Sequence, residues 1–224
     1  MPPIPPLTMK LLWAVAAMLI LPYALPPSIL VQMVMWPLGD WVFGVDSGQA
    51  LPSFMPWQLL THVLYNPGVG GVLFVGLTLF FFGSALEATW GERRYGLFLL
   101  AVVIGGGIIE LLVLSICVRA GWTPFHPVTG ASAVMYGILF ACAYLDPNRR
   151  VMLLIPPIPM KMWVLVAVFT ALELLFGIFG SINGVAHVGF LGGMLAAWLH
   201  IRYWRGQPPF RPRGPKRPNL RSVN

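Results

Sequence analysis

The chain has 224 residues, of which 58% are hydrophobic and only 9% are charged. A soluble domain averages about 25% charged residues, so this composition excludes an ordinary soluble globular protein and indicates a membrane protein. The formal net charge of +7 does not indicate a nucleic-acid partner, because seven of the fourteen lysines and arginines lie together between Arg202 and Arg221.

Six segments are apolar and long enough to be predicted as transmembrane helices, since crossing a bilayer as an α-helix takes about 20 apolar residues. In chain order they are 10–36, 69–89, 95–118, 128–145, 158–179 and 182–203. Pro22, Pro26 and Pro27 break the first segment. Its long apolar core, with no clear small-residue cleavage site, favours a retained anchor over a signal peptide. The predicted fold class is an all-α polytopic membrane protein, a bundle of six transmembrane helices.

Basic residues fall almost entirely on one side of these predicted spans. With the loops assigned alternately to two sides, Arg119 is the single basic residue on the second side. The first side holds thirteen: Lys10, Arg93, Arg94, Arg149, Arg150, Lys161 and the seven of the C-terminal segment. By the positive-inside rule, this asymmetry predicts that both termini are cytoplasmic. We expect a multi-pass protein of the plasma (inner) membrane, surrounded by lipid bilayer.

Three regions follow from these spans. Residues 1–9 are predicted to be a short cytoplasmic N-terminus, residues 10–203 a six-helix membrane domain, and residues 204–224 a tail rich in proline and arginine. This composition is typical of disorder. We interpret the tail as a topogenic signal that also contacts anionic lipid headgroups; a dedicated partner-binding role is the alternative.

One serine and one histidine are predicted to lie at similar shallow depth below the outer face. At 1.5 Å per helical residue, Ser132 lies about 6 Å into the fourth span and His187 about 8 Å into the sixth. Histidine is the usual base that activates a serine hydroxyl, so the two form a candidate catalytic dyad. Small residues at four-residue spacing should let the two helices approach closely; they are Ala133, Gly137 and Ala141, with Gly189, Gly193 and Ala197.

The segments around these residues resemble those of the rhomboid family of intramembrane serine proteases. "GASAVMYG" (130–137) resembles that family's Gly-x-Ser segment on its fourth helix, and "AHVGFLGG" (186–193) its histidine segment on the sixth. "WQLLTHVLYN" (57–66) is similar to its Trp-Arg loop, with Gln58 in place of arginine, and "FFFGSALEATWG" (80–91) to the end of its second helix. The resemblance covers about residues 55–203.

This resemblance implies an endopeptidase that cleaves single-pass or polytopic membrane proteins near the outer membrane face. Ser132 would attack the peptide carbonyl, and His187 would take its proton and later deliver it to the leaving amine. Gly130 and Tyr136 would support the site, Tyr136 as the aromatic that the family often stacks on the histidine. No cofactor is implied. No metal site is predicted either, because the four histidines and two cysteines share no ligand spacing.

The oxyanion residues of the family are where this sequence departs from it. The family's second helix usually carries His-x-x-x-Asn, but counting back without gaps from Gly83 places Gly71 and Val75 at these positions. A literal His-x-x-x-Asn occurs earlier, at His62 and Asn66. We favour the gapless alignment, in which Asn66 is a possible oxyanion donor from the loop beside backbone amides near Ser132.

One other departure and three acidic residues bear on the alternatives. Ala133 replaces the glycine that commonly follows the serine. A catalytically weak or inactive relative that binds membrane clients is therefore the main alternative. Glu110 and Glu173 lie inside predicted spans, where a charge is costly, and no basic partner at matching depth is evident. A small transporter, the third class, would use them as ion sites. Glu87 is expected to contact Arg93 or Arg94.

Overall fold

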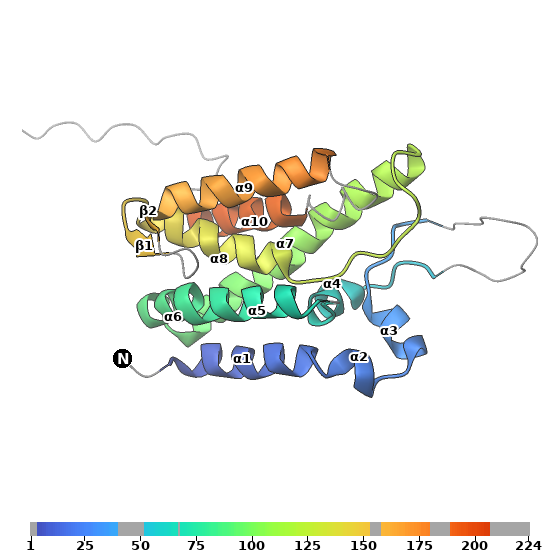
Figure 1. Cartoon of the computed structure of the whole chain (residues 1–224), viewed down its shortest axis with the longest axis horizontal. Helices are drawn as coiled ribbons and strands as arrows, with labels where there is room; N and C mark the ends of the chain where they lie inside the picture. The colour runs from blue at the N-terminus through green and yellow to red at the C-terminus, as the bar shows by residue number, and fades with distance from the viewer. Residues whose placement is uncertain (1–3, 40–51, 67, 153–157, 180–188, 207–224) are drawn as a thin grey trace, which may run out of the picture.

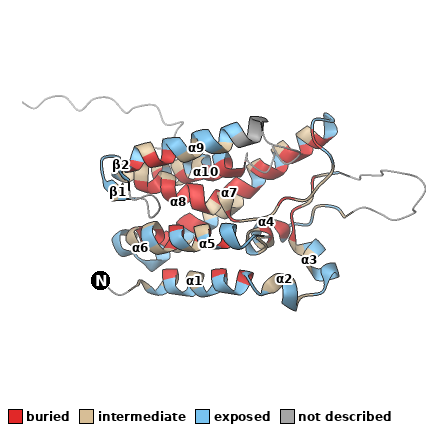
Figure 2. Cartoon of the chain, viewed as in Figure 1, coloured by how far each residue is buried: buried red, intermediate tan, exposed pale blue. Residues whose placement is uncertain are grey.

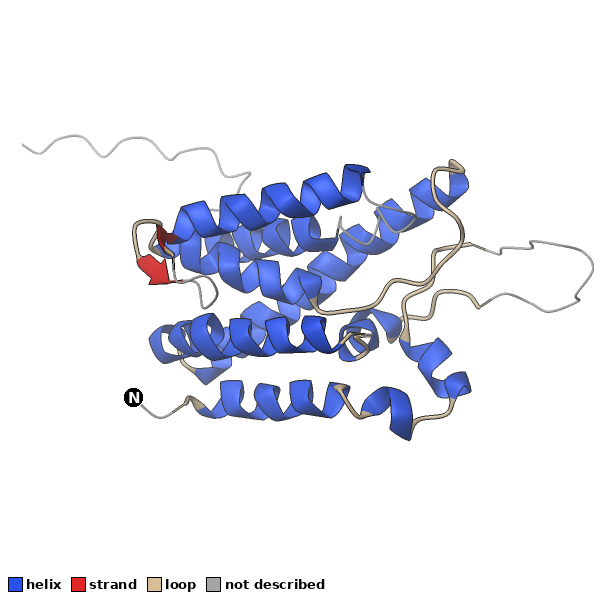
Figure 3. Ribbon diagram, in the orientation of Figure 1, coloured by secondary structure: helices blue, strands red, loops and turns tan. Residues whose placement is uncertain are grey.

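The computed structural model describes residues 4–39, 52–66, 68–152, 158–179 and 189–206, and these form a bundle of helices with one short hairpin (Figures 1 and 3). The helical fold class is confirmed. In chain order, the helices that precede α5 are α1 (Pro6–Met18), α2 (Leu21–Ala24), α3 (Pro27–Met33), α4 (Gln58–Thr61) and η1 (His62–Leu64). The helices and the two strands that follow are α5 (Val69–Thr78), η2 (Leu79–Gly83), α6 (Ser84–Trp90), α7 (Glu92–Arg119), α8 (Ser132–Leu145), β1 (Arg150–Met152), β2 (Pro159–Lys161), α9 (Met162–Phe179) and α10 (Gly189–Trp204).

Two helical rods are long and apolar enough to cross a membrane by themselves. One is the continuous stretch Val69–Trp90, formed by α5, η2 and α6, with a mean hydropathy of 2.1. The other is α7, 28 residues long with a mean hydropathy of 2.7. Further apolar helices of 10–17 residues lie at Pro6–Met18, Ser132–Leu145 and Met162–Leu175. The second and third predicted spans are thus matched in full, while the remaining four correspond to shorter described helices.

Proline divides the first predicted span, as the sequence indicated. α1 ends at Met18, and α3 begins at Pro27 itself. A proline cannot donate the helical N–H bond and clashes with the preceding turn, so it is tolerated only in the first turn of a helix. The predicted first span is consequently divided among three helices, α1, α2 and α3. Of these, α1 lies along the edge of the bundle against α5 and α6 (Figure 1).

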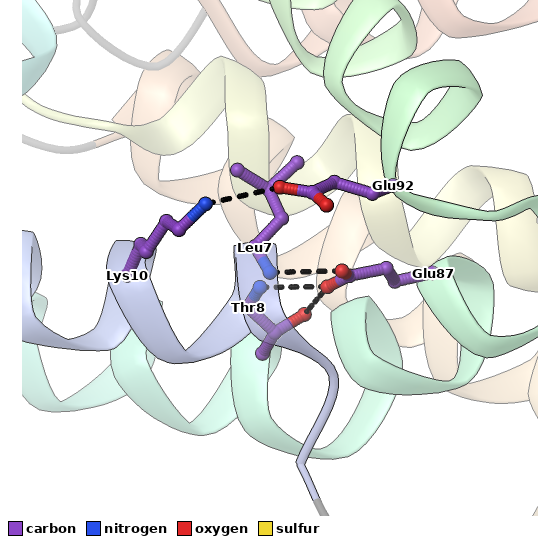
Figure 4. Close-up of polar contacts among 5 residues, drawn as sticks. All are labelled: Leu7, Thr8, Lys10, Glu87 and Glu92. Atoms are coloured by element: carbon purple, nitrogen blue, oxygen red, sulfur yellow. Dashed lines mark hydrogen bonds and ion pairs between the residues drawn. The ribbon is translucent and has the colours of Figure 1, made fainter.

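A buried carboxylate fixes the start of α1 against the end of α6 (Figure 4). Glu87, only 3% exposed, accepts hydrogen bonds from the backbone N–H groups of Leu7 at 2.8 Å and Thr8 at 2.6 Å, and from the Thr8 hydroxyl at 2.7 Å. The first N–H groups of a helix lack intrahelical partners and favour negative charge. The expected contact of Glu87 with Arg93 or Arg94 is therefore wrong: the carboxylate caps α1 instead.

Small residues bring α7, α8 and α10 into close backbone contact, as predicted for α8 and α10. A methyl group added at Gly106 of α7 would lie 2.7 Å from Cβ of Ala133 and 3.3 Å from Cα of Gly193. One added at Gly137 would lie 3.4 Å from the carbonyl oxygen of Gly193. Such close approach is the usual effect of small residues between membrane helices. Burial is accordingly most continuous along α8, which has no exposed residue between Ala133 and Cys142 (Figure 2).

Candidate active site

Ser132 is the first residue of α8, which begins there and not at residue 128. The backbone before it is extended, because Val128 and Met35 exchange backbone hydrogen bonds of 2.8 and 3.0 Å. Gly130 has a φ of 109°, which glycine adopts without the steric cost that other residues meet. The predicted helix start at residue 128 is therefore wrong: the half-buried serine is the first residue of the helix and not one turn inside it.

Gly130 supports this serine through its backbone. Its N–H donates a 3.0 Å hydrogen bond to the carbonyl oxygen of His62, in η1. This bond ties the turn in front of Ser132 to the loop that precedes α5. The first turn of α8 has no side-chain cap, so its leading N–H groups are left to face whatever occupies the space beyond the helix end. Negative charge is favoured at that point.

A cavity of about 410 Å³ opens beside Ser132, between α5, the turn before α8 and α9. It brings together four residues that stand out separately in the sequence: Ser132, Gly130, Asn66 and Glu173. The other described residues that line it are Gly70, Gly71, Phe74, Val75, Thr129, Ala131 and Met135. Gly71 and Val75, the positions of the family's oxyanion residues in the gapless alignment, thus face the same space as the serine.

The side chain of Asn66 fills the place that a side chain at position 71 would take. A methyl group added at Gly71 would lie 2.7 Å from Oδ1 and 2.8 Å from Nδ2 of Asn66. The carboxamide, an N–H donor, consequently lies on the glycine backbone of α5 and lines the cavity with Ser132. The sequence signal for Asn66 was the His-x-x-x-Asn motif that it ends; only the fold brings its side chain to the second helix.

Tyr136 lies one helical turn after Ser132 and holds Glu173. Its hydroxyl donates a 3.0 Å hydrogen bond to Oε1 of Glu173 on α9, and its ring packs 5.0 Å from the ring of Phe190 on α10. His187 lies outside the described residues, so its predicted pairing with Ser132 and its stacking on Tyr136 stay predictions. The structure does bring the described start of α10, at Gly189, into the bundle beside α7 and α8.

A second buried polar pair, which no motif in the sequence indicated, lies beneath the loop that carries His62. Oε2 of Glu110 on α7 lies 4.0 Å from Nε2 of His62, and the two side chains are 2% and 0% exposed. The other ring nitrogen, Nδ1, lies 2.7 Å from the carbonyl oxygen of Gln58. Burial lowers the pKa of His62 below its ordinary value of 6.5. Glu110 therefore has a histidine neighbour, contrary to the expectation that it has no basic partner.

The carboxyl group of Glu110 also lies against the start of α10. A methyl group added at Gly189 would lie 2.5 Å from its Cδ atom. Glu110 thus contacts α10 directly. It also lies beside His62, whose own backbone carbonyl accepts the hydrogen bond from Gly130. Nothing in the sequence pairs these residues, which lie in different elements. Among the described residues, no three histidine, cysteine or acidic side chains gather closely enough to hold a metal ion.

Comparison with known proteins finds one matching family and several similar proteins. The family described as "Eukaryotic integral membrane protein (DUF1751)" matches residues 12–220. A putative rhomboid protease, YdcA, of Bacillus subtilis (strain 168) is 28% identical over 190 residues, 84% of this chain and 86% of the relative. Rhomboid protease GluP of the same organism is 28% identical over 157 residues, and rhomboid-like protein 19 of Arabidopsis thaliana 25% over 162. Each of these two alignments covers 70% of this chain, but only 28% of GluP and 52% of the Arabidopsis protein.

Proposed function

The chain belongs to the DUF1751 family of integral membrane proteins and is rhomboid-like; from this premise we propose that it is an intramembrane serine endopeptidase. The proposal includes six membrane spans, cytoplasmic termini and a location in the plasma (inner) membrane. Its substrates are membrane proteins whose transmembrane segments open near the outer face. The observation that carries the proposal is that Ser132 lines one cavity with the carboxamide of Asn66.

In the proposed reaction, Oγ of Ser132 attacks the substrate's carbonyl carbon while His187 takes the hydroxyl proton. The resulting oxyanion is held by the N–H groups of the first turn of α8 and by Nδ2 of Asn66. When the C–N bond breaks, His187 returns the proton to the leaving amine. Removing one oxyanion donor typically costs about 10²–10³ in rate, so Asn66 offsets the missing side-chain donors at Gly71 and Val75.

The proposed topology is supported by where the basic residues lie. Arg150 and Lys161 pair in the β1–β2 hairpin, which lies at the same end of the bundle as the turn between α6 and α7 and the start of α1 (Figure 1). Arg119 ends α7 at the opposite end. Lysine and arginine concentrate on the cytoplasmic side of membrane proteins. The hairpin end is therefore the cytoplasmic end of this proposal, and the Ser132 end of α8 is the outer one.

A fluorophosphonate probe, which reacts covalently with activated serines, tests the dyad in the purified full-length protein. Wild type should be labelled, whereas Ser132→Ala and His187→Ala should not. Ser84→Ala is the matched control: this serine is also in a membrane helix, and its hydroxyl donates to the Phe80 carbonyl one turn before it. Labelling of Ser132→Ala at the wild-type level would remove the proposed nucleophile.

One observation favours a second function, a rhomboid-like protein that binds membrane clients without cleaving them. Gly71 and Val75 line the cavity at the positions where the family usually has its oxyanion side chains. In this reading the cavity is a binding surface, and crosslinking to membrane clients should be equal in wild type and Ser132→Ala. Absence of both labelling and substrate cleavage in wild type, with client crosslinking retained, would favour this second function.

A further inference from the structure

We propose that an anionic phospholipid binds in a groove between α8 and α10, with an acyl chain against the apolar lining and the phosphate headgroup on Arg202 and Arg205. The groove shares no lining residue with the cavity beside Ser132, so the site goes beyond the proposed protease function and does not depend on it. Two features carry the inference: the lining of the groove, and the two arginines at one end of it.

The lining of the groove suits a hydrocarbon chain. A cavity of about 450 Å³ opens at the surface of the bundle, and the described residues that line it are Phe140 of α8 with Met194, Leu195 and Trp198 of α10. Sites for small molecules typically have volumes of about 300–1,000 Å³. Leu195 is 46% exposed, so the groove is open to its surroundings. A polar occupant would lose its hydrogen bonds against such a lining, whereas an acyl chain has none to lose.

The wall that α10 provides ends on an arginine. The guanidinium carbon of Arg202 lies 4.8 Å from the centroid of the Trp198 ring, which lines the groove. Residues four apart on a helix are neighbours on one face, so Arg202 continues the row of lining residues by one turn towards the end of α10. A guanidinium over a tryptophan face is held there by cation–π attraction.

The wall that α8 provides ends in the same way. The Phe140 ring stacks on the Tyr144 ring one turn later, with centroids 5.9 Å apart and planes 18° from parallel. The guanidinium carbon of Arg205, which follows the last residue of α10, lies 5.5 Å from the centroid of the Tyr144 ring. The C-terminal ends of α8 and α10 therefore lie together, and both walls of the groove end on positive charge.

The other end of the groove is in contact with α9. The Thr170 hydroxyl of α9 donates a 3.8 Å hydrogen bond to Sδ of Met194, the lining residue of α10 that is furthest along the chain from Arg202. The groove thus has an apolar end at α9 and a basic end at the two arginines. An occupant with one apolar and one anionic end fits it in a single orientation.

An anionic phospholipid combines these two requirements in one molecule. In the proposed topology the basic end is cytoplasmic, and basic pockets between transmembrane helices on that side bind anionic lipid headgroups. The N–H groups of arginine lie in the plane of the guanidinium and match a phosphate, while its face stacks on a ring. Arg205 is exposed, so a headgroup can reach it. A free anion would leave the apolar lining uncovered, and a lipid without net charge would leave the positive charge unmatched.

The test compares phosphatidylglycerol and phosphatidylcholine with identical acyl chains, added to the full-length protein in detergent. Native mass spectrometry measures bound lipid, and thermal unfolding measures the stabilisation. Wild type should bind phosphatidylglycerol about tenfold or more tightly, since each basic residue near the membrane surface contributes about fivefold in affinity for anionic lipid. Arg202→Gln/Arg205→Gln should lose most of this preference.

The matched control for charge is Arg93→Gln/Arg94→Gln, which should keep the preference. It removes the same charge from the first turn of α7, which lies at the same end of the bundle because the Trp90 ring packs 5.6 Å from the Trp204 ring, but it lies on neither wall of the groove. Equal loss of preference in the two double variants would overturn the inference. If Arg202→Gln/Arg205→Gln does not fold, Arg205→Gln decides, because this exposed position tolerates the change: it should lose about fivefold in affinity, and no loss would overturn the inference.

A tryptophan in the groove tests the acyl-chain contact. Leu195→Trp fills the groove from an exposed position and should weaken binding of both lipids at least several-fold. Leu112→Trp is its control, because Leu112 of α7 is 49% exposed and lies outside the groove lining; this variant should bind both lipids as wild type does. Wild-type lipid binding by Leu195→Trp, or equal affinity of wild type for the two lipids, would overturn the inference.

Two other occupants have distinct outcomes in the same experiment. Glycerophosphoglycerol, the headgroup without acyl chains, should not stabilise the protein; stabilisation equal to that by phosphatidylglycerol would identify an anion site and overturn the inference. A dimer in wild type that Leu195→Trp abolishes would show that a second copy of the chain covers the groove, and would overturn it too. Neither measurement requires catalysis, so the result holds whether or not Ser132 is labelled by the fluorophosphonate probe.

Discussion

Nε2 of His62 and Oε2 of Glu110 lie 4.0 Å apart with both side chains closed off from solvent. His62 also accepts, through its backbone carbonyl, the N–H of Gly130 two residues before the candidate nucleophile. The pair therefore joins α7, the loop before α5 and the turn in front of Ser132. Substitution of either side chain should therefore shift the turn in front of Ser132 and so alter the candidate site.

The pH dependence of stability should report the burial of His62. Burial lowers its pKa below 6.5 in the folded protein, so below pH 6.5 the unfolded chain binds a proton that the folded chain excludes. Stability is then fully present above pH 6.5 and falls as the pH drops towards the folded-state pKa. Thermal unfolding in detergent between pH 5 and 8 measures this, and His62→Gln should flatten the profile. An equally steep profile in His62→Gln would contradict it.

Loss of the Glu87 carboxylate should release the start of α1. Glu87→Ala leaves the N–H groups of Leu7 and Thr8 without their acceptor, which costs about 1–3 kcal/mol for each buried group left unpaired. Thr8→Ala removes only the hydroxyl bond and should cost less, about 0.5–1.5 kcal/mol. The readout is the free energy of unfolding, together with protease sensitivity near the N-terminus.

Lys10→Ala is the control for that experiment, because Lys10 forms a 3.1 Å ion pair with Glu92 next to the same helix start (Figure 4). Both side chains are largely exposed, and such pairs contribute little. Destabilisation by Lys10→Ala as large as that by Glu87→Ala would show that the cap is not the important contact.

Asn66 and Gly71 should behave as one unit in catalysis. Asn66→Ala removes the proposed oxyanion donor and should lower kcat about 10²–10³-fold with little change in KM. Gly71→Ala should lower it as well, because the added methyl group collides with the carboxamide. The double variant should be no slower than the slower single variant, since both changes remove the same donor. Multiplied losses in the double variant would contradict a shared role.

The contact between α10 and α8 at Gly193 should not tolerate a side chain at that position. A methyl group there meets the backbone carbonyl of Ala133, which cannot move without shifting α8. Overpacking of this kind typically costs about 1–3 kcal/mol. Gly70→Ala is the matched control, because nothing lies within 4 Å of an added methyl group at this position, and alanine in a helix is favoured over glycine by about 1 kcal/mol. Detergent unfolding should thus show opposite signs for the two variants, and equal effects would contradict the packing argument.

Part of this protein was determined by the sequence alone. Composition required a membrane protein, the prolines broke the first apolar segment, and small residues at four-residue spacing predicted the contact between α8 and α10. The motif order indicated rhomboid resemblance and selected Ser132, Gly130 and Asn66. These features depend on chain-local properties: hydrophobicity over a window, helix periodicity and the missing N–H of proline.

Tertiary structure alone decided which polar groups meet. It paired the Glu87 carboxylate with the backbone N–H of Thr8 at the start of α1, 79 residues away in the chain, and not with the nearby arginines. It placed Glu173 beside Ser132 through a hydrogen bond from Tyr136, which lies 37 residues before Glu173 in the chain. It also laid the side chain of Asn66 over Gly71. In a bundle of apolar helices each buried polar group must find a partner wherever packing brings one within reach. That choice depends on helix rotation and close approach across the bundle, which no local pattern in the chain encodes.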